Sequence, residues 1–298
     1  MLDVCAFGHI TRESEEWYGH RREFIAGPPY FFSIALKRLG NSVMVITKLN
    51  PKDKYLLAEL EKEGIPIVLK ESSRTSSFHT IYGKSLDERI IKVISVADPF
   101  TLDDLVCCQA ARYIYLGPLT IRDFDLEFLI EARKKAPLIL DVQGFTRRVV
   151  GDKIEYVDWD WKHEGIKYVD IFKADSREAR ILTGLDNVVD ALKKLLEWGV
   201  KEVLITSNKG VYLGVKGLKI FFAPFIVDKI QGRVGRGDTC TAAYTHARLR
   251  GMDYKEAIIF AAAATSLKLG YQGPLKNDEK DVMKYISERY RGIDPKIE

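Results

Sequence analysis

Short apolar runs alternate along the chain with longer segments in which apolar residues recur at helical spacing. The apolar runs predict strands at Val4–Phe7, Val43–Thr47, Ile65–Leu69, Tyr113–Leu116, Leu138–Val142, Val169–Phe172 and Val203–Thr206. Segments such as Tyr55–Lys62 and Phe124–Lys135 predict helices between them. Because strands that alternate with helices form parallel sheets, the pattern indicates an α/β fold with helices on both faces of the sheet.

Two β-rich segments interrupt this alternation. Thr75–Tyr82 and Arg89–Val96 lie on either side of the polar turn Lys84–Asp87, and no helical pattern separates them. Two strands joined by a short polar turn predict a hairpin rather than a strand–helix–strand unit. The residues by themselves place this hairpin at an edge of the main sheet.

Length and charge narrow the class of protein. A chain of 298 residues without a linker or repeat suits a single domain over residues 1–298. The net charge is +4 and the basic residues are scattered among acids, so no nucleic-acid partner is expected. With no apolar run of membrane-spanning length, we expect a cytoplasmic protein without a membrane partner. The four cysteines show no C-x-x-C spacing and indicate neither zinc nor disulfides.

A glycine-rich segment, Gly232–Cys240, comes directly before a long Ala-rich helical pattern. A helix N-terminus offers free N–H groups and a positive dipole end, so it favours a bound anion. The spacing nearly matches the phosphate-binding pattern G-x-x-x-x-G-K-[ST], but Asp238 replaces the lysine. A carboxylate kept ionised by the helix dipole can accept a proton from a hydroxyl that attacks a phosphoryl group. A simple helix cap is the alternative role for Asp238.

The segment also resembles the C-terminal signature D-T-x-G-A-G-D-[ST] of the PfkB (ribokinase-like) carbohydrate kinases. Four residues match it, namely Gly235, Gly237, Asp238 and Thr239. The departures are Gly232, Arg233 and Arg236, which replace the first Asp, the first Thr and the Ala. In the family that first Asp helps to organise a monovalent-cation site, so the replacement leaves potassium dependence open.

Further landmarks in family order span nearly the whole chain. They include Gly8–Glu13, Ala26–Tyr30, Arg38–Gly40, Leu116–Pro118, Leu140–Gly144, Asp175–Glu178 and Gly273–Pro274. The resemblance implies a ribokinase-like three-layer sandwich with a mainly parallel central sheet. It also implies a small β lid over the substrate, formed from about residues 11–25 and 74–97.

The resemblance implies a kinase that uses ATP or ADP with Mg²⁺ and phosphorylates a small sugar, polyol or cyclitol. Asp238 would be the general base, the N–H groups from Gly235 to Asp238 would bind the transferring phosphoryl group, and Arg236 would stabilise its charge. The implied donor-binding residues are Lys173, Asp175, Glu178, Thr206, Gly210 and Ala264. Glu178 would act on Mg²⁺ through water, although Asp175 and Glu178 also fit a capping box without any metal.

On the acceptor side, the resemblance implies Glu13, Gly27, His79 and Gln143 beside the substrate, with Asp238. The family's substrate-binding Asn falls at Phe31, which cannot replace its hydrogen bonds, and this argues against a standard ribokinase. Together with the G-R-G-D-T loop, this departure resembles a thermophile branch with inositol-kinase-like members, which implies a cyclitol or related polyol as the acceptor. Three alternatives remain open: a kinase of a phosphorylated sugar or nucleoside, a non-catalytic sugar or nucleotide sensor, and a nucleotide-binding oxidoreductase. The oxidoreductase needs G-x-G-x-x-G after the first strand, where only Gly8 stands. A homodimer is possible.

Overall fold

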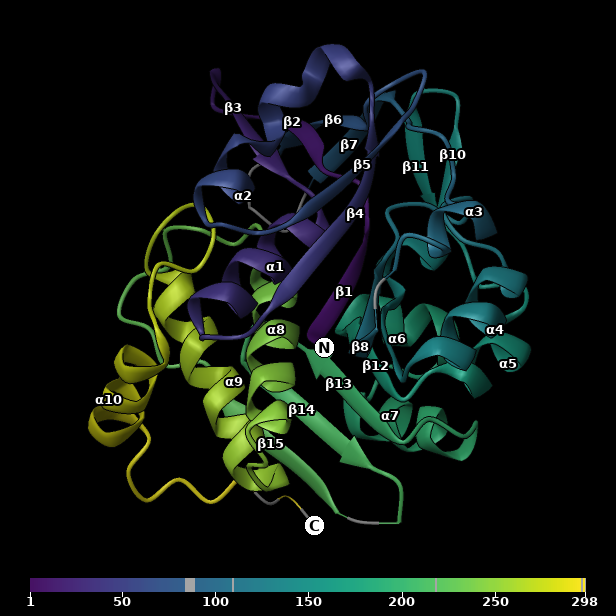
Figure 1. Ribbon diagram of the computed structural model, residues 1–298. Helices are drawn as coiled ribbons and strands as arrows, with labels where there is room; N and C mark the ends of the chain where they lie inside the picture. The colour runs from purple at the N-terminus through teal and green to yellow at the C-terminus, as the bar shows by residue number, and fades with distance from the viewer. Residues whose placement is uncertain (84–88, 109, 218, 296, 298) are drawn as a thin grey trace.

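The computed structural model describes residues 1–83, 89–108, 110–217, 219–295 and 297. A nine-stranded main sheet has the strand order β15-β14-β13-β12-β9-β8-β1-β4-β5 (Figure 1). Neighbouring strands pair in parallel from β5 to β13, and β14 and β15 continue the sheet antiparallel. The strands are β1 (Leu2–Gly8), β4 (Val43–Leu49), β5 (Ile67–Glu71), β8 (Ala111–Gly117), β9 (Leu138–Asp141), β12 (Ile171–Asp175), β13 (Glu202–Thr206), β14 (Gly210–Val215) and β15 (Ile220–Pro224). The predicted α/β fold with a mainly parallel sheet is therefore confirmed.

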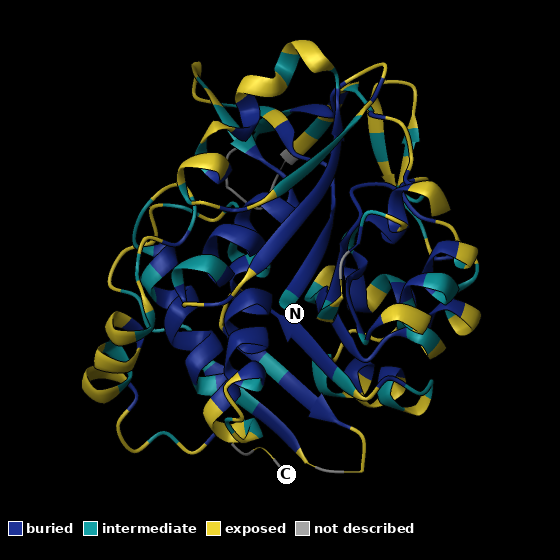
Figure 2. Cartoon of the chain, viewed as in Figure 1, coloured by how far each residue is buried: buried dark blue, intermediate teal, exposed yellow. Residues whose placement is uncertain are grey.

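Helices cover both faces of this sheet (Figure 1). One face carries α1 (Pro28–Arg38), α8 (Arg236–Leu249), α9 (Tyr254–Leu269) and α10 (Glu279–Arg289). The other carries α3 (Leu102–Leu105), α4 (Leu126–Lys135), α5 (Lys162–Gly165), α6 (Ser176–Thr183) and α7 (Val188–Glu197). Figure 2 shows the strands buried and the outward faces of these helices exposed. Within the described ranges, no helix is long and apolar enough to cross a membrane.

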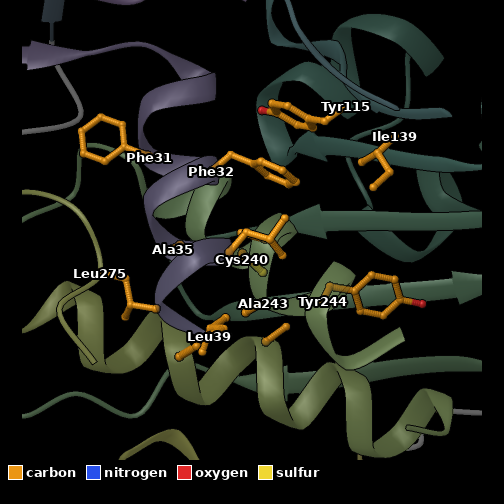
Figure 3. Packing of buried hydrophobic residues seen from close by; sticks show 14 of the residues in the cluster. Phe31, Phe32, Ala35, Leu39, Tyr115, Ile139, Cys240, Ala243, Tyr244 and Leu275 are labelled. Atoms are coloured by element: carbon orange, nitrogen blue, oxygen red, sulfur yellow. The ribbon is translucent and has the colours of Figure 1, made fainter. Parts of the chain in front are cut away.

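The packing of α1, α8 and α9 fixes the part of the fold that carries the glycine loop. Phe32 of α1 stacks on Tyr115 of β8 with ring centroids 3.9 Å apart (Figure 3). The alanines from Ala261 to Ala264 are fully buried in α9. These small residues let α9 approach α8 closely, so α8 is packed tightly between α9 and α1.

A second, six-stranded sheet has the order β10-β11-β7-β6-β2-β3 and is called the small sheet below. Its strands are β2 (Thr11–Trp17), β3 (His20–Ala26), β6 (Ser77–Tyr82), β7 (Arg89–Ser95), β10 (Arg147–Val150) and β11 (Lys153–Tyr156). β6 and β7 pair antiparallel, which confirms the hairpin, while its turn at residues 84–87 lies outside the described residues. The placement at an edge of the main sheet was wrong, because β6 pairs with β2 of the small sheet. Strands β10 and β11 were not predicted.

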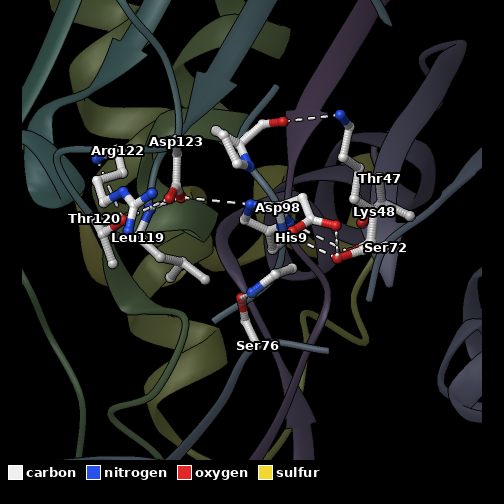
Figure 4. Close-up of polar contacts among 12 residues, drawn as sticks. His9, Thr47, Lys48, Ser72, Ser76, Asp98, Leu119, Thr120, Arg122 and Asp123 are labelled. Carbon is white, nitrogen blue, oxygen red and sulfur yellow. Dashed lines mark hydrogen bonds and ion pairs between the residues drawn. The ribbon is translucent and has the colours of Figure 1, made fainter. Parts of the chain in front are cut away.

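Polar contacts fix the segments that cross between the two sheets (Figure 4). Asp98, after β7, accepts hydrogen bonds from the Ser72 hydroxyl at 3.0 Å and the Ser73 N–H at 2.9 Å, both after β5. Lys48 donates to the Pro99 carbonyl at 2.8 Å. Since these contacts join the segment entering the small sheet to the one leaving it, the base of the small sheet is anchored on the main sheet.

Several predicted boundaries differ from the structure. The segment predicted as one helix over Tyr55–Lys62 is a 3₁₀ helix over Pro51–Leu57 followed by α2 (Ala58–Lys62), because Asn50 and Pro51 start the turn earlier. Short 3₁₀ helices also cover Val142–Thr146 and Ile166–Tyr168. Because of the 3₁₀ helix at Ile166–Tyr168, β12 begins at Ile171 instead of the predicted Val169. The strand then runs to Asp175 instead of ending at Phe172.

Candidate active site

The N-terminus of α8 is shaped by a glycine in a left-handed conformation. Gly235 is the N-cap residue with φ of 79°, and a Cβ there would overlap the ring of Phe31. The Arg236 N–H donates to the Arg233 carbonyl at 3.2 Å, and the Thr239 N–H donates to the Gly235 carbonyl at 3.0 Å. Among the described residues, the N–H groups of Gly235 and Gly237 have no hydrogen-bond acceptor. This turn can therefore bind an anion through backbone N–H groups.

Three neighbouring strands of the main sheet end at this loop, and their last residues are Asp141, Asp175 and Thr206. Lys173, two residues before the end of β12, is buried, and its Nζ lies 2.9 Å from Asp141 Oδ2. A Cβ at Gly237 would lie 2.7 Å from that Nζ, so the ammonium sits directly against the glycine loop. The ends of parallel strands and a helix N-terminus thus meet in one place, the usual ligand site of such sheets.

The Asp238 carboxylate faces the cleft from the first turn of α8. Burial and the nearby Asp141 raise its pKa to about 7, while Lys173 and the hydrogen bond from Tyr115 lower it. The helix dipole was expected to keep this carboxyl fully ionised, but the surrounding protein brings its pKa close to neutrality. A base of this pKa suits proton transfer near pH 7.

Asp175 and Glu178 form the predicted capping box. The Glu178 N–H donates to Asp175 Oδ1 at 2.8 Å, and the Asp175 N–H donates to Glu178 Oε2 at 2.6 Å. Burial, followed by repulsion from Asp175, raises the pKa of Glu178 to about 7, although Lys173 lowers it. The carboxylates around Lys173, led by Asp141, hold the pKa of its ammonium above the usual value against the opposing effect of burial. The cap is therefore present, and a second role for Glu178 through water is compatible with it.

A cleft of about 1300 Å³ lies between the glycine loop and the small sheet. On the predicted acceptor side, the residues that line it are Glu13, Gly27, Phe31 and Gln143. His79 does not line it, and its Nδ1 instead lies 2.8 Å from the Ser14 hydroxyl. Its neighbours Phe78 and Thr80 face the cleft, as alternation along a strand requires.

On the predicted donor side, Thr206 lines the cleft together with Ser207 and Asn208. The Thr206 Oγ1 is buried and has no hydrogen-bond partner within the part of the chain that the structure describes. Three other predicted donor residues do not line the cleft, and one of them, Glu178, is buried beside Asp175. Gly210 starts β14 against the carbonyl of Ala223, and Ala264 is fully buried in α9, so neither lines the cleft.

Positive side chains from several elements line the cleft, and sequence reasoning missed most of them. Besides Lys173 and Arg236, they are Arg22, Arg147, Arg177, Lys229, Arg233, Lys268 and Lys276. The Arg177 guanidinium lies 3.5 Å from the centre of the Tyr156 ring, so β11 of the small sheet supports it. Burial lowers the pKa of the Arg236 guanidinium, an effect partly offset by Asp175. A cleft lined in this way favours a ligand with several negative charges.

A model of the pfkB family carbohydrate kinases matches residues 19–281. The chain belongs to the pfkB family. A sulfate-complex structure of a pyrophosphate-dependent kinase in the ribokinase family is 33% identical, with a TM-score of 0.89 over 95% of this chain and 100% of that chain. A pyrophosphate-dependent kinase complexed with a pyrophosphate analog and myo-inositol is 32% identical, with a TM-score of 0.87 over 94% of this chain and 99% of that one.

Curated relatives belong to the same group of kinases. Ribokinase from Arabidopsis thaliana is 32% identical over 195 residues, which cover 62% of this chain and 48% of the plant enzyme. The chain thus matches about half the length of that relative. An ATP-dependent 6-phosphofructokinase from Thermoanaerobacterium thermosaccharolyticum is 26% identical over 281 residues, 85% of this chain and 81% of that enzyme. This pfkB chain is a ribokinase-like kinase, and its relatives differ in both donor and acceptor.

Proposed function

We propose that this protein phosphorylates a hydroxyl of a cyclitol such as myo-inositol, with inorganic pyrophosphate as the donor. One observation carries the proposal: Asp238 and the free N–H groups of the glycine loop face a cleft lined by cations from both sheets. Two relatives of this shape that are more than 30% identical are described as pyrophosphate-dependent kinases, one of them with myo-inositol bound. A third is described as a myo-inositol-1 kinase converted into a myo-inositol-3 kinase.

Asp238 acts as the general base in this proposal. Its carboxylate takes the proton from the acceptor hydroxyl, and the acceptor oxygen forms a bond to the phosphorus of the donor. The bridging P–O bond then breaks and inorganic phosphate leaves. The N–H groups of Gly235 and Gly237, with Arg236, stabilise the charge on the transferring group.

The donor end of the cleft supports pyrophosphate over a nucleoside triphosphate. Arg147, Arg177 and Lys229 line the same cleft as Ser207 and Asn208, the residues after Thr206, and these side chains match a compact polyanion. Gly210 and Ala264, which were expected to contact a nucleotide, instead pack inside the protein. A nucleotide donor remains the second candidate, because Thr206 and its loop line the cleft where the family places the nucleotide.

Asp175 lines the cleft and Glu178 is buried beside it, so this pair of carboxylates would act on a Mg²⁺ ion through the water ligands that such an ion keeps. Within the described residues, no group of three or more His, Cys, Asp or Glu side chains could hold a metal ion. The ion would therefore be bound mainly by water and by donor oxygens, and Glu178 would act on it through water. A bound Mg²⁺ would neutralise charge on the donor phosphates.

The decisive assay crosses donors with acceptors. Pyrophosphate, ATP and ADP are each tested with myo-inositol, ribose, fructose 6-phosphate and cytidine, and phosphorus NMR identifies the product. We expect an inositol monophosphate with pyrophosphate and weaker or no product with the nucleotides. If ribose or cytidine is phosphorylated and ATP is the only donor that works, both the proposed donor and the proposed acceptor are wrong. Binding of myo-inositol without turnover by any donor would favour a sensor.

A further inference from the structure

Lys268 is a fully buried cation at the C-terminal end of α9. Its Nζ donates to the Gly232 carbonyl at 2.8 Å, and its side chain forms part of the cleft wall. Among the residues that the structure describes, no carboxylate forms an ion pair with it. Burial lowers its pKa to about 8, although the Asp238 carboxylate opposes this. Burying an ammonium without a carboxylate partner lowers the stability of the folded protein, which indicates that Lys268 has a functional role.

The carbonyl that Lys268 binds belongs to the segment that leads into the anion-binding turn. The N–H groups of Gln231 and Gly232 both donate to the Leu269 carbonyl, at 2.8 and 3.3 Å. A Cβ at Gly232 would overlap the Tyr271 carbonyl, so only glycine lets these backbones approach so closely. The end of α9 therefore holds the start of the glycine loop at several points, and Lys268 provides the only charged one among the described contacts.

We propose that Lys268 is a positioning residue for phosphoryl transfer, whose ammonium serves as a built-in cation that fixes the glycine loop. The inference rests on the proposed kinase activity. Because the Lys268 ammonium holds the Gly232 carbonyl, the glycine loop keeps the N–H groups of Gly235 and Gly237 turned toward the cleft. The same positive charge favours the anionic donor, whose binding compensates the buried ammonium. The enzyme then needs no dissolved monovalent cation at this place.

The test compares Lys268→Ala and Lys268→Met with the wild type, and uses Lys255→Met as control. Lys255 lies on the same helix, exposed and paired with Asp294 at 2.8 Å, far from the loop contacts. We expect kcat of both Lys268 variants to fall about 10- to 100-fold, the usual loss when a supporting partner of a site is removed. The acceptor KM should stay close to that of the wild type, and the control should keep wild-type kcat.

Chemical rescue separates a cation from a mere packing role. Ammonium or potassium should restore part of the activity of Lys268→Ala, whose truncated side chain leaves room for an ion, and should not restore Lys268→Met. The wild type should show the same kcat in potassium and in tetramethylammonium buffers. A potassium requirement in the wild type, or wild-type kcat in Lys268→Met, would overturn the proposal.

Hydrogen exchange tests the proposal without any turnover. In the unliganded Lys268→Met variant, the backbone amides of residues 230–237 should exchange faster than in the wild type, and Lys255→Met should leave them unchanged. Unchanged exchange in Lys268→Met would contradict the positioning role even if the enzyme is active. Faster exchange together with an inactive wild type would instead count against the proposed function alone.

Discussion

The Tyr115 hydroxyl donates a hydrogen bond to Oδ1 of Asp238 at 3.4 Å. Tyr115 is fully buried in β8, and its ring is fixed by the stacked ring of Phe32. Burial, followed by the negative charge of Asp238, raises the pKa of this tyrosine well above its usual value. Tyr115 therefore remains a donor at every pH of interest, and it favours the ionised form of the proposed base.

Removal of this hydroxyl should change the pH dependence of the reaction. In Tyr115→Phe the Asp238 carboxylate loses a donor to its charged form, so its pKa rises above about 7. Because the base must be ionised, the acidic limb of the kcat/KM profile should move to higher pH. A profile with an unchanged acidic limb would show that Asp238 does not set it.

Ionisation of the buried Asp238 carboxyl should also lower the stability of the folded protein. The pKa of Asp238 is raised from 3.8 in the unfolded chain to about 7 in the folded protein, so its ionisation destabilises the fold as the pH rises between these values. Asp238→Asn should therefore have a higher Tm than the wild type at pH 8, and the gain should vanish near pH 3.5. A gain of the same size at both pH values would point to packing instead of charge.

The role of Glu178 can be separated from its cap. Glu178→Gln keeps a side-chain oxygen that can accept from the Asp175 N–H, but it removes the charge that a hydrated Mg²⁺ would use. We expect a higher Mg²⁺ requirement and lower kcat. Glu256→Gln is the matched control, since Glu256 closes the same kind of capping box with Asp253 in α9. If Glu178→Gln and Glu256→Gln require the same Mg²⁺ concentration, Glu178 serves only as a helix cap.

Closure of the small sheet should depend on the acceptor. Phe78 and Thr80 face the cleft, so a bound cyclitol would contact this sheet while its base stays anchored at Asp98 and Ser72. Acceptor binding should slow hydrogen exchange in Thr75–Tyr82 and in Arg89–Val96 more than the donor alone does. Equal protection by both ligands would argue against a lid.

The glycine loop, Asp238 and the Asp175–Glu178 box could be predicted because each depends on residues close together in the sequence. Tyr115 and Asp141 could not, since they reach Asp238 and Lys173 only through the order of strands in the sheet. Asp141 did leave a signal, as an acidic residue at the end of a buried strand. His79 lies on the face of β6 opposite to Phe78 and Thr80, and the sequence of this strand does not indicate which face meets the cleft because both faces carry polar and apolar residues.

The central claim is that Asp238 removes the proton from the acceptor hydroxyl. Single-turnover phosphorylation of myo-inositol, with pyrophosphate and enzyme at saturating concentrations, measures this step directly in Asp238→Asn and in the wild type. The account predicts that the variant binds both ligands but reacts about 10²- to 10⁴-fold more slowly. A single-turnover rate equal to that of the wild type, with chemistry rate-limiting in both, would contradict it.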